Sequence, residues 1–121
     1  MHNFKELKVW QLSRDLVKEI YEVTAEFPSS EKYGLVSQLR RCTVSVPTNI
    51  AEGSGRNTDK DFAHFLNISL GSAYELETLL ILSFDVNLIS EDMLNKFSTK
   101  ISEIQKMTFG LIKTLRQESN V

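Results

Sequence analysis

The sequence predicts an all-α protein that folds as an antiparallel, up-down-up-down bundle of four helices. Apolar residues recur at three- and four-residue steps through four long segments, the pattern of amphipathic helices. The 121 residues include only 2 Pro and 5 Gly, so turns are few and elements are long. Capping residues and helix stops separate the segments. Four long helices joined by short loops favour an antiparallel bundle, and the length suits one domain spanning residues 1–121.

The first helix is predicted at about residues 4–26. It ends before Pro28, because the residue that precedes a proline disfavours helical geometry. Charged residues occupy the other faces of this segment. Its apolar positions are Leu7, Trp10, Leu12, Leu16, Val17, Ile20, Tyr21 and Val23.

The second helix is predicted at about residues 31–52 and contains a proline. Pro47 removes one backbone hydrogen bond, so we expect a kink near Thr43. The alternative is two shorter helices broken around residues 45–47. One bent helix is favoured because the apolar stripe keeps its phase across the proline. Gly53-Ser54-Gly55 follows as a stop, since glycine accepts the left-handed conformation at a helix C-terminus.

The third and fourth helices are predicted at about residues 59–87 and 91–117. Thr58 and Ser90 precede them as N-cap residues. The third helix is apolar on more than one side, and a single bundle covers only one side of a helix. The surplus therefore suggests a subunit interface. Residues 71–73, Gly-Ser-Ala, give this helix a narrow waist where another helix could approach closely.

Composition argues for an ordered protein without a broad nucleic-acid footprint. Hydrophobic residues make up 41% and charged residues 25%, close to globular averages, and the net charge is −2. Residues 1–57 hold 8 Lys+Arg against 7 Asp+Glu, and residues 58–121 hold 6 against 9. Dedicated nucleic-acid binders are basic overall, so any such contact requires a local patch.

The chain is expected to be cytoplasmic. A single cysteine excludes an internal disulfide and fits a reducing compartment. The N-terminus has no apolar run of signal-peptide length, and no stretch approaches the roughly 20 apolar residues that span a bilayer.

No catalytic constellation, metal site or cofactor motif is predicted. A di-metal bundle needs Glu-x-x-His motifs on paired helices, whereas the chain has only His2 and His64. Cys42 lies on the apolar stripe of the second helix, which favours a buried, inert thiol over a nucleophile.

The polar residues of segment 38–56, QLRRCTVSVPTNIAEGSGR, are the candidate functional residues. Arg40, Arg41 and Arg56 are candidates for phosphate binding, because the planar guanidinium bonds phosphate bidentately. Lys5 and Lys8 would add to that patch. The expected structural polar network comprises Ser45, Asn49, Glu52, Glu75 and Glu77.

Within that network, Glu75 or Glu77 is expected to pair with Arg40 or Arg41 across the contact between the second and third helices. Such a pair fixes register more surely than it stabilises. The alternative reading is acid–base chemistry by the two carboxylates.

Several segments resemble a bacterial protein family: KELKVWQLSRDL, FPSSEKYGLVSQLRRCTVSVPTNIAEGSGR and FAHFLNISLGSAYELETLL. The chain is similar to the four-helix-bundle proteins encoded in intervening sequences of 23S rRNA genes, which often carry a ribosomal-protein-like label. The likeness covers roughly residues 4–85. These proteins are similar in fold to the accessory protein of diversity-generating retroelements, which works with a reverse transcriptase and binds nucleic acid through a basic surface.

The resemblance implies a non-enzymatic bundle that assembles into a ring-like homopentamer with an RNA-linked accessory role. The expected partners are other copies of the chain and RNA or another nucleic acid. The acidic composition leaves a second reading open, a protein-interaction scaffold that does not bind nucleic acid.

Overall fold

The computed structural model describes residues 2–119, and their side chains up to residue 117. These residues are helical or irregular and contain no strand, which confirms the predicted all-α class. The four long helices are α1 (Lys8–Thr24), α2 (Leu35–Ser54), α3 (Asp59–Asp85) and α4 (Glu91–Ser119). Two short 3₁₀ helices, η1 (Phe4–Glu6) and η2 (Ser29–Glu31), precede α1 and α2.

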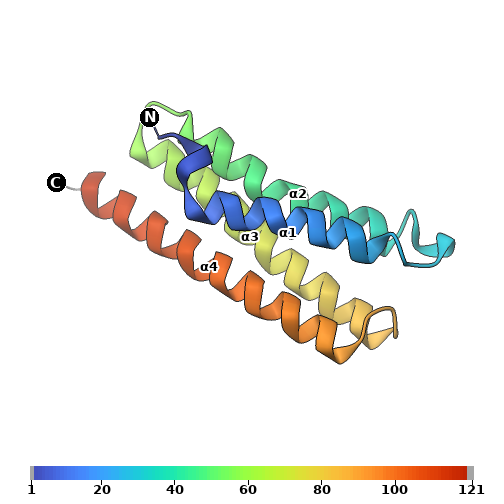
Figure 1. Cartoon of the computed structure of the whole chain (residues 1–121). Coiled ribbons are helices and arrows are strands. Elements are labelled where there is room, and N and C mark those ends of the chain that lie inside the picture. Colours follow the sequence, from blue (N-terminus) through green and yellow to red (C-terminus); the bar gives the residue numbers. More distant parts are fainter. Residues whose placement is uncertain (1, 120–121) are drawn as a thin grey trace.

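Each of the four long helices packs against two others, and the contact between α2 and α3 is the most extensive. In the described chain, α2 contacts α1 and α3, and α4 contacts α3 and, less extensively, α1. Within this region the backbones of α1 and α3, and those of α2 and α4, do not approach each other closely, so these are the diagonal pairs. Figure 1 shows consecutive helices running in opposite directions, with both termini at one end of the bundle. The outer faces of α2 and α4 therefore look away from each other.

The first two helices begin later than predicted, because short 3₁₀ turns replace their first residues. Asn3 caps η1 by accepting a hydrogen bond from the Lys5 amide, and Leu7 is extended before α1 starts. After Pro28, η2 turns once and Gly34 takes a non-helical conformation before α2. The predicted N-caps of the last two helices are confirmed, since Thr58 and Ser90 accept bonds from the amides of Asp61 and Met93.

The predicted glycine stop after the second helix is wrong in its mechanism. Gly53 and Ser54 are helical, and Gly55 has a right-handed φ of −86°. A Cβ at Gly53 would lie 2.7 Å from Cβ of Phe65 and 2.9 Å from Cδ1 of Phe62. Glycine is therefore needed at position 53 for the close approach of α2 to α3, rather than for a left-handed turn.

Pro47 lies inside a single continuous helix, which supports one helix over two shorter ones. The bend near Thr43 stays a prediction. The Thr43 side chain is buried, and its Oγ1 has no hydrogen-bond partner among the described residues.

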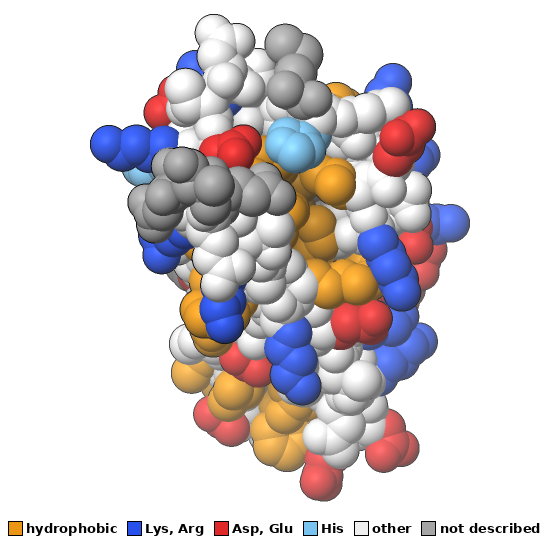
Figure 2. All heavy atoms as spheres, turned by 90° about the vertical axis from the view of Figure 1, so that its left-hand side faces the viewer, with side chains coloured by type: hydrophobic (Ala, Val, Ile, Leu, Met, Phe, Trp, Pro, Cys, Tyr) orange, Lys and Arg blue, Asp and Glu red, His pale blue; other side chains and the backbone are white. Residues whose placement is uncertain are grey.

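The core lies along the bundle axis and contains side chains from all four helices. Apolar side chains also reach the surface, and Figure 2 shows a hydrophobic strip on the end face, flanked by side chains of both charges. The largest fully buried side chains are Phe62, Phe97, Ile20, Leu39, Ile50, Leu66, Leu76, Leu80, Ile101, Ile104, Leu115 and Val46.

Helix α3 corrects the expectation that no segment approaches the requirements of a membrane span. By length and composition alone it would suffice, with a mean hydropathy of 1.2 over its most apolar window. One such helix is weak evidence for a membrane span, because the core helix of a soluble protein meets the same criteria. α3 packs against both α2 and α4, and 33% of that window is buried in the bundle.

Candidate functional site

Arg40 and Arg41 are neighbours on α2, but their side chains have different surroundings. Arg40 turns toward α1, where its Nε donates to Thr24 Oγ1 at 3.0 Å. Its guanidinium carbon lies 4.4 Å from the centre of the Tyr21 ring, within the range of a cation–π contact. Arg40 is therefore half-buried and held in place by α1.

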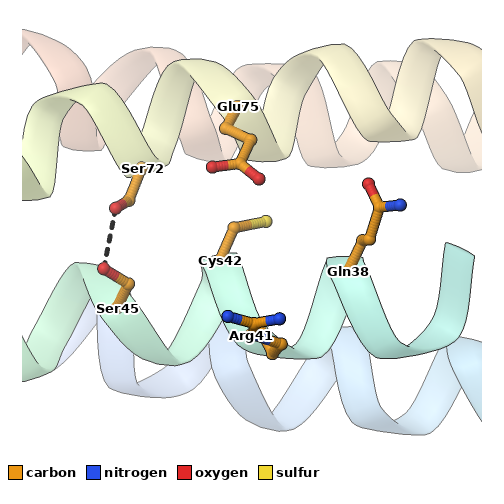
Figure 3. A pocket seen from close by; sticks show the side chains of 6 residues that line it. All are labelled: Gln38, Arg41, Cys42, Ser45, Ser72 and Glu75. Carbon is orange, nitrogen blue, oxygen red and sulfur yellow. Dashed lines mark hydrogen bonds between the residues drawn. The ribbon is translucent and has the colours of Figure 1, made fainter. Parts of the chain in front are cut away.

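Arg41 is exposed and lies on the ridge of α2 between two depressions. One is a pocket of about 440 Å³ between α2 and α3, drawn in Figure 3 with its six lining side chains. In that view Glu75 reaches from α3 toward Cys42, while Arg41 stays beside α2.

The ion pair expected between Arg40 or Arg41 and the α3 glutamates is absent from the described structure. Arg40 is directed to α1 instead, and Glu77 accepts from Gln105 Nε2 at 3.3 Å on the α4 side. The two glutamates thus point to different grooves, since positions two apart on a helix do not share a face.

The polar contact between α2 and α3 is made by hydroxyl and backbone carbonyl groups rather than by ions. Ser45 Oγ and Ser72 Oγ lie 2.7 Å apart. Asn49 Nδ2 donates to the Ser45 carbonyl at 2.8 Å and to its Oγ at 2.9 Å. Buried Ser69 donates to the Val46 carbonyl at 2.8 Å. The Ser45–Ser72 and Ser69–Val46 bonds join the two helices and fix their register without placing a charge in the core, while Asn49 bonds Ser45 within α2.

Cys42 has the character of a structural thiol. Its side chain is buried, and its Sγ lies 3.5 Å from the Leu39 carbonyl oxygen. Burial, assisted by the negative charge of Glu75, raises the pKa of the Cys42 thiol to about 12. The thiolate needed for nucleophilic chemistry is therefore scarce at neutral pH.

Arg56 lies apart from the other two candidate arginines. It follows α2, fifteen positions beyond Arg41, which corresponds to about 22 Å along a helix axis. Its guanidinium pairs with Glu52 at 2.8 Å and stacks 4.6 Å from the centre of the Phe65 ring. Glu52 thus belongs to this exposed pair rather than to the Ser45–Asn49 network.

Three separate hollows, which share some of their lining residues, lie along α1 and its contact with α2, and together we call them the basic groove. Arg40 and Arg41 line the hollow that also contains Tyr21 of α1. Four cations line the basic groove, Arg14, Lys18, Arg40 and Arg41, against one carboxylate, Asp15. The remaining lining residues are Phe4, Trp10, Val17, Tyr21, Val44, Ser45, Pro47, Thr48 and Ala51.

Sequence reasoning missed the contribution of α1 to this groove. Trp10, Arg14, Lys18 and Tyr21 recur at steps of four, four and three, so they form a second stripe on the helix. The guanidinium carbon of Arg14 lies 5.6 Å from the Trp10 ring centre. Of the two lysines expected to help, Lys5 lies 5.9 Å from the ring centre of Phe4, at the groove end, and Lys8 is exposed.

The surplus apolar surface predicted for the third helix is present on α3. Five large side chains of this helix and its end are between 41% and 57% exposed: Ile68, Tyr74, Ile81, Leu82 and Val86. We call this set the α3 face. The predicted waist is only partly formed, because Ala73 is buried while Gly71 faces open space.

Within residues 2–119, no cluster of three or more His, Cys, Asp or Glu side chains is arranged to hold a metal ion.

The comparisons with known proteins place these features in one family. The model of the 23S rRNA-intervening sequence protein family matches residues 5–110. A crystal structure of a Bacteroides thetaiotaomicron protein of unknown function, from the S23 ribosomal protein family, superposes with a TM-score of 0.81. The two are 25% identical, and the match covers 87% of this chain and 95% of the other. No curated protein matches.

Proposed function

The chain belongs to the 23S rRNA-intervening sequence protein family, and from that premise we propose that it is a non-enzymatic, nucleic-acid-linked accessory protein. In this proposal it works in the bacterial cytoplasm as a homo-oligomer, a pentamer by resemblance, and needs no metal or cofactor. The observation that carries the proposal is the basic groove on a chain whose net charge is −2.

The groove supplies the local patch that nucleic-acid binding by an acidic protein requires. Three of its four cations are arginines, whose planar donors match phosphate oxygens. Arg41 and Lys18 form no ion pair within the described chain, although each shares a hollow with one carboxylate, Glu75 and Asp15 respectively. Proteins gain most of their sequence-independent affinity for nucleic acid from such contacts, through release of counterions.

The α3 face supports the oligomer. Monomeric proteins rarely expose contiguous apolar patches larger than a few hundred Å², and such patches commonly mark interaction sites. Closing a ring of copies around one axis would cover this face on each subunit.

Size-exclusion chromatography with light scattering, recorded at protein and nucleic-acid wavelengths, tests the proposal. We expect a mass near five subunits and co-eluting nucleic acid that high salt removes. A clean multimer that never carries or binds nucleic acid would contradict the nucleic-acid role, and a monomer would contradict the assembly.

The second candidate function is a protein-interaction scaffold, which the charge of α3 favours. The chain contains no Lys or Arg from residue 61 to residue 95, a stretch that includes Asp61, Glu75, Glu77 and Asp85. An acidic, apolar surface suits a basic protein partner. Capture of a protein partner that is lost on changing Leu82, from preparations free of nucleic acid, would favour this function.

A further inference from the structure

We infer that the basic groove binds single-stranded nucleic acid, with bases on its apolar floor and phosphates on its cationic walls. This inference rests on the proposed function and adds to it the form of nucleic acid that the groove recognises. It is carried by the shape and chemistry of the floor, by two arginine–aromatic pairs and by the excess of four cations over one carboxylate.

The floor of the groove suits flat apolar rings. It includes a hollow of about 350 Å³ whose lining is almost entirely apolar, with Trp10, Val17 and Pro47 among the residues that form it. A duplex keeps its bases stacked inside and presents sugars and phosphates, which would leave this hollow unfilled. A single strand can turn its bases outward and stack them on aromatic rings or on guanidinium planes.

The walls combine a stacking surface and a phosphate donor at two places. Arg14 lies over Trp10, and Arg40 lies over Tyr21. Trp10 and Tyr21 are eleven positions apart on α1, or about 16 Å along the helix axis. Each pair offers the outer plane of a guanidinium, backed by a ring, on which a base can stack, and guanidinium donors that the protein does not use remain for a phosphate. The two pairs can therefore hold a segment of several nucleotides along the groove.

An acidic amphipathic peptide is the alternative occupant, since it would also bring apolar and negative groups. The structure favours the nucleic acid because arginines of the groove lie against aromatic rings. This geometry suits a ligand that carries a planar base next to a phosphate. A peptide helix would use the apolar floor but would gain little from these faces. The two occupants are separated in the experiment.

The only tryptophan of the chain, Trp10, lies in the groove and reports its occupancy directly. We would titrate the purified protein with a single-stranded oligouridylate of about 12 nucleotides, following Trp10 fluorescence. A matched RNA duplex and an acidic amphipathic peptide would be titrated in parallel. We expect saturable quenching by the single strand, at least about tenfold weaker binding of the duplex, and no response to the peptide. With three to four phosphates contacted, log K should fall with log salt with a slope of about −2 to −3.

Three variants, each with Trp10 retained, locate the binding. Arg41→Gln removes an exposed cation without an ion pair, and should make the salt slope shallower by about 0.7. Tyr21→Leu keeps apolar bulk but removes a stacking ring, and should weaken binding between about 5- and 150-fold. Lys106→Gln removes one charge from the exposed surface of α4, which supplies no lining residue of the basic groove, and should change nothing beyond a small general salt effect. Thermal unfolding of each variant verifies that the fold is kept.

The outcomes separate this inference from the proposed function. A labelled oligonucleotide could bind without changing Trp10 fluorescence and without loss of affinity in the groove variants. In that case the nucleic-acid role survives and the groove inference fails. Equal or tighter binding of the duplex would also overturn the inference. Trp10 quenching by the peptide alone would replace it with a protein partner, and absence of any nucleic-acid binding would defeat both proposals.

Discussion

Two sides of one small bundle differ in both charge and packing. The α1–α2 side carries the basic groove, whose rings and arginines are already in contact with one another. The α3 face carries apolar side chains between 41% and 57% exposed, and its helix has no cation beyond Lys60. The comparison teaches that a net charge of −2 describes neither side, because it averages a basic surface with an acidic one.

The largest effect is expected from a charge placed on the α3 face, which would test whether this side is a subunit interface. Leu82→Glu puts a carboxylate at a position that is 46% exposed, so the isolated subunit should keep its fold. In an oligomer that covers this face, the buried charge would be unpaired and would cost several kcal/mol. We expect light scattering to show a shift from multimer to monomer.

The exposed residue Tyr33 offers a matched control for that change. It is 89% exposed and lies between η2 and α2, away from α3 in sequence. Tyr33→Glu should leave the mass unchanged. A Leu82→Glu protein that keeps its wild-type mass would show that the α3 face is not the subunit interface.

The contact between α2 and α3 joins the two sides, and a substitution at this contact has the next largest expected effect. Gly53→Ala would add a Cβ 2.7 Å from that of Phe65, in a helix contact with no room to yield. Overpacking of this kind destabilises the fold by about 1–3 kcal/mol. This loss exceeds the stability that the higher helix propensity of alanine would add. Denaturant unfolding should show a lower midpoint.

Gly110→Ala is the opposite case, since nothing lies within 4 Å of the added methyl group on α4. Alanine should stabilise there by about 0.5–1 kcal/mol, because glycine loses more backbone entropy in a helix. Equal effects at the two sites would contradict a specific role for Gly53 in helix packing.

The sequence predicted the architecture well because helical periodicity is a local signal. In the predicted stripe of the second helix, Leu39, Cys42, Val46 and Ile50 are buried and Leu35 is partly buried against the core. Both predicted N-caps form. The role of Gly53 was misassigned because a close approach between helices depends on residues of the partner helix, which no local pattern contains.

The candidate site was harder to predict, because residues from two helices build it. Arg40 and Arg41 stood out in the sequence, but the partners of Arg40, Tyr21 and Thr24, lie sixteen or more positions away. Antiparallel packing led us to expect an ion pair between Arg40 or Arg41 and the α3 glutamates, yet the position of a residue along a helix does not determine which way its side chain turns. The stripe of Trp10, Arg14 and Lys18 was visible in the sequence, although only the packing of α1 on α2 makes it part of a groove.

A pair of threonines tests how the groove side is held in place, with effects of opposite sign. Thr43 Oγ1 is buried without a hydrogen-bond partner in the described chain, so Thr43→Val should stabilise by about 1 kcal/mol. Thr24 Oγ1 donates to the Ile20 carbonyl and accepts from Arg40, so Thr24→Val should destabilise by about 1 kcal/mol. Urea unfolding measures both, and a loss of stability on Thr43→Val would mean that its hydroxyl has a partner in solution.

Substitution of Arg56 should have the smallest effect on the free energy of unfolding. It also tests whether nucleic acid contacts the C-terminal end of α2 as well as the basic groove. Its pair with Glu52 is exposed on both sides, and such surface pairs contribute about 0–1 kcal/mol. Arg56→Gln should therefore change the free energy of unfolding by less than about 1 kcal/mol, with the stack on Phe65 as the larger part. Nucleic-acid affinity should be unchanged within the general salt effect, whereas Arg41→Gln weakens it. If the two substitutions weaken binding equally, the nucleic acid runs the length of α2, and the contact surface extends beyond the basic groove.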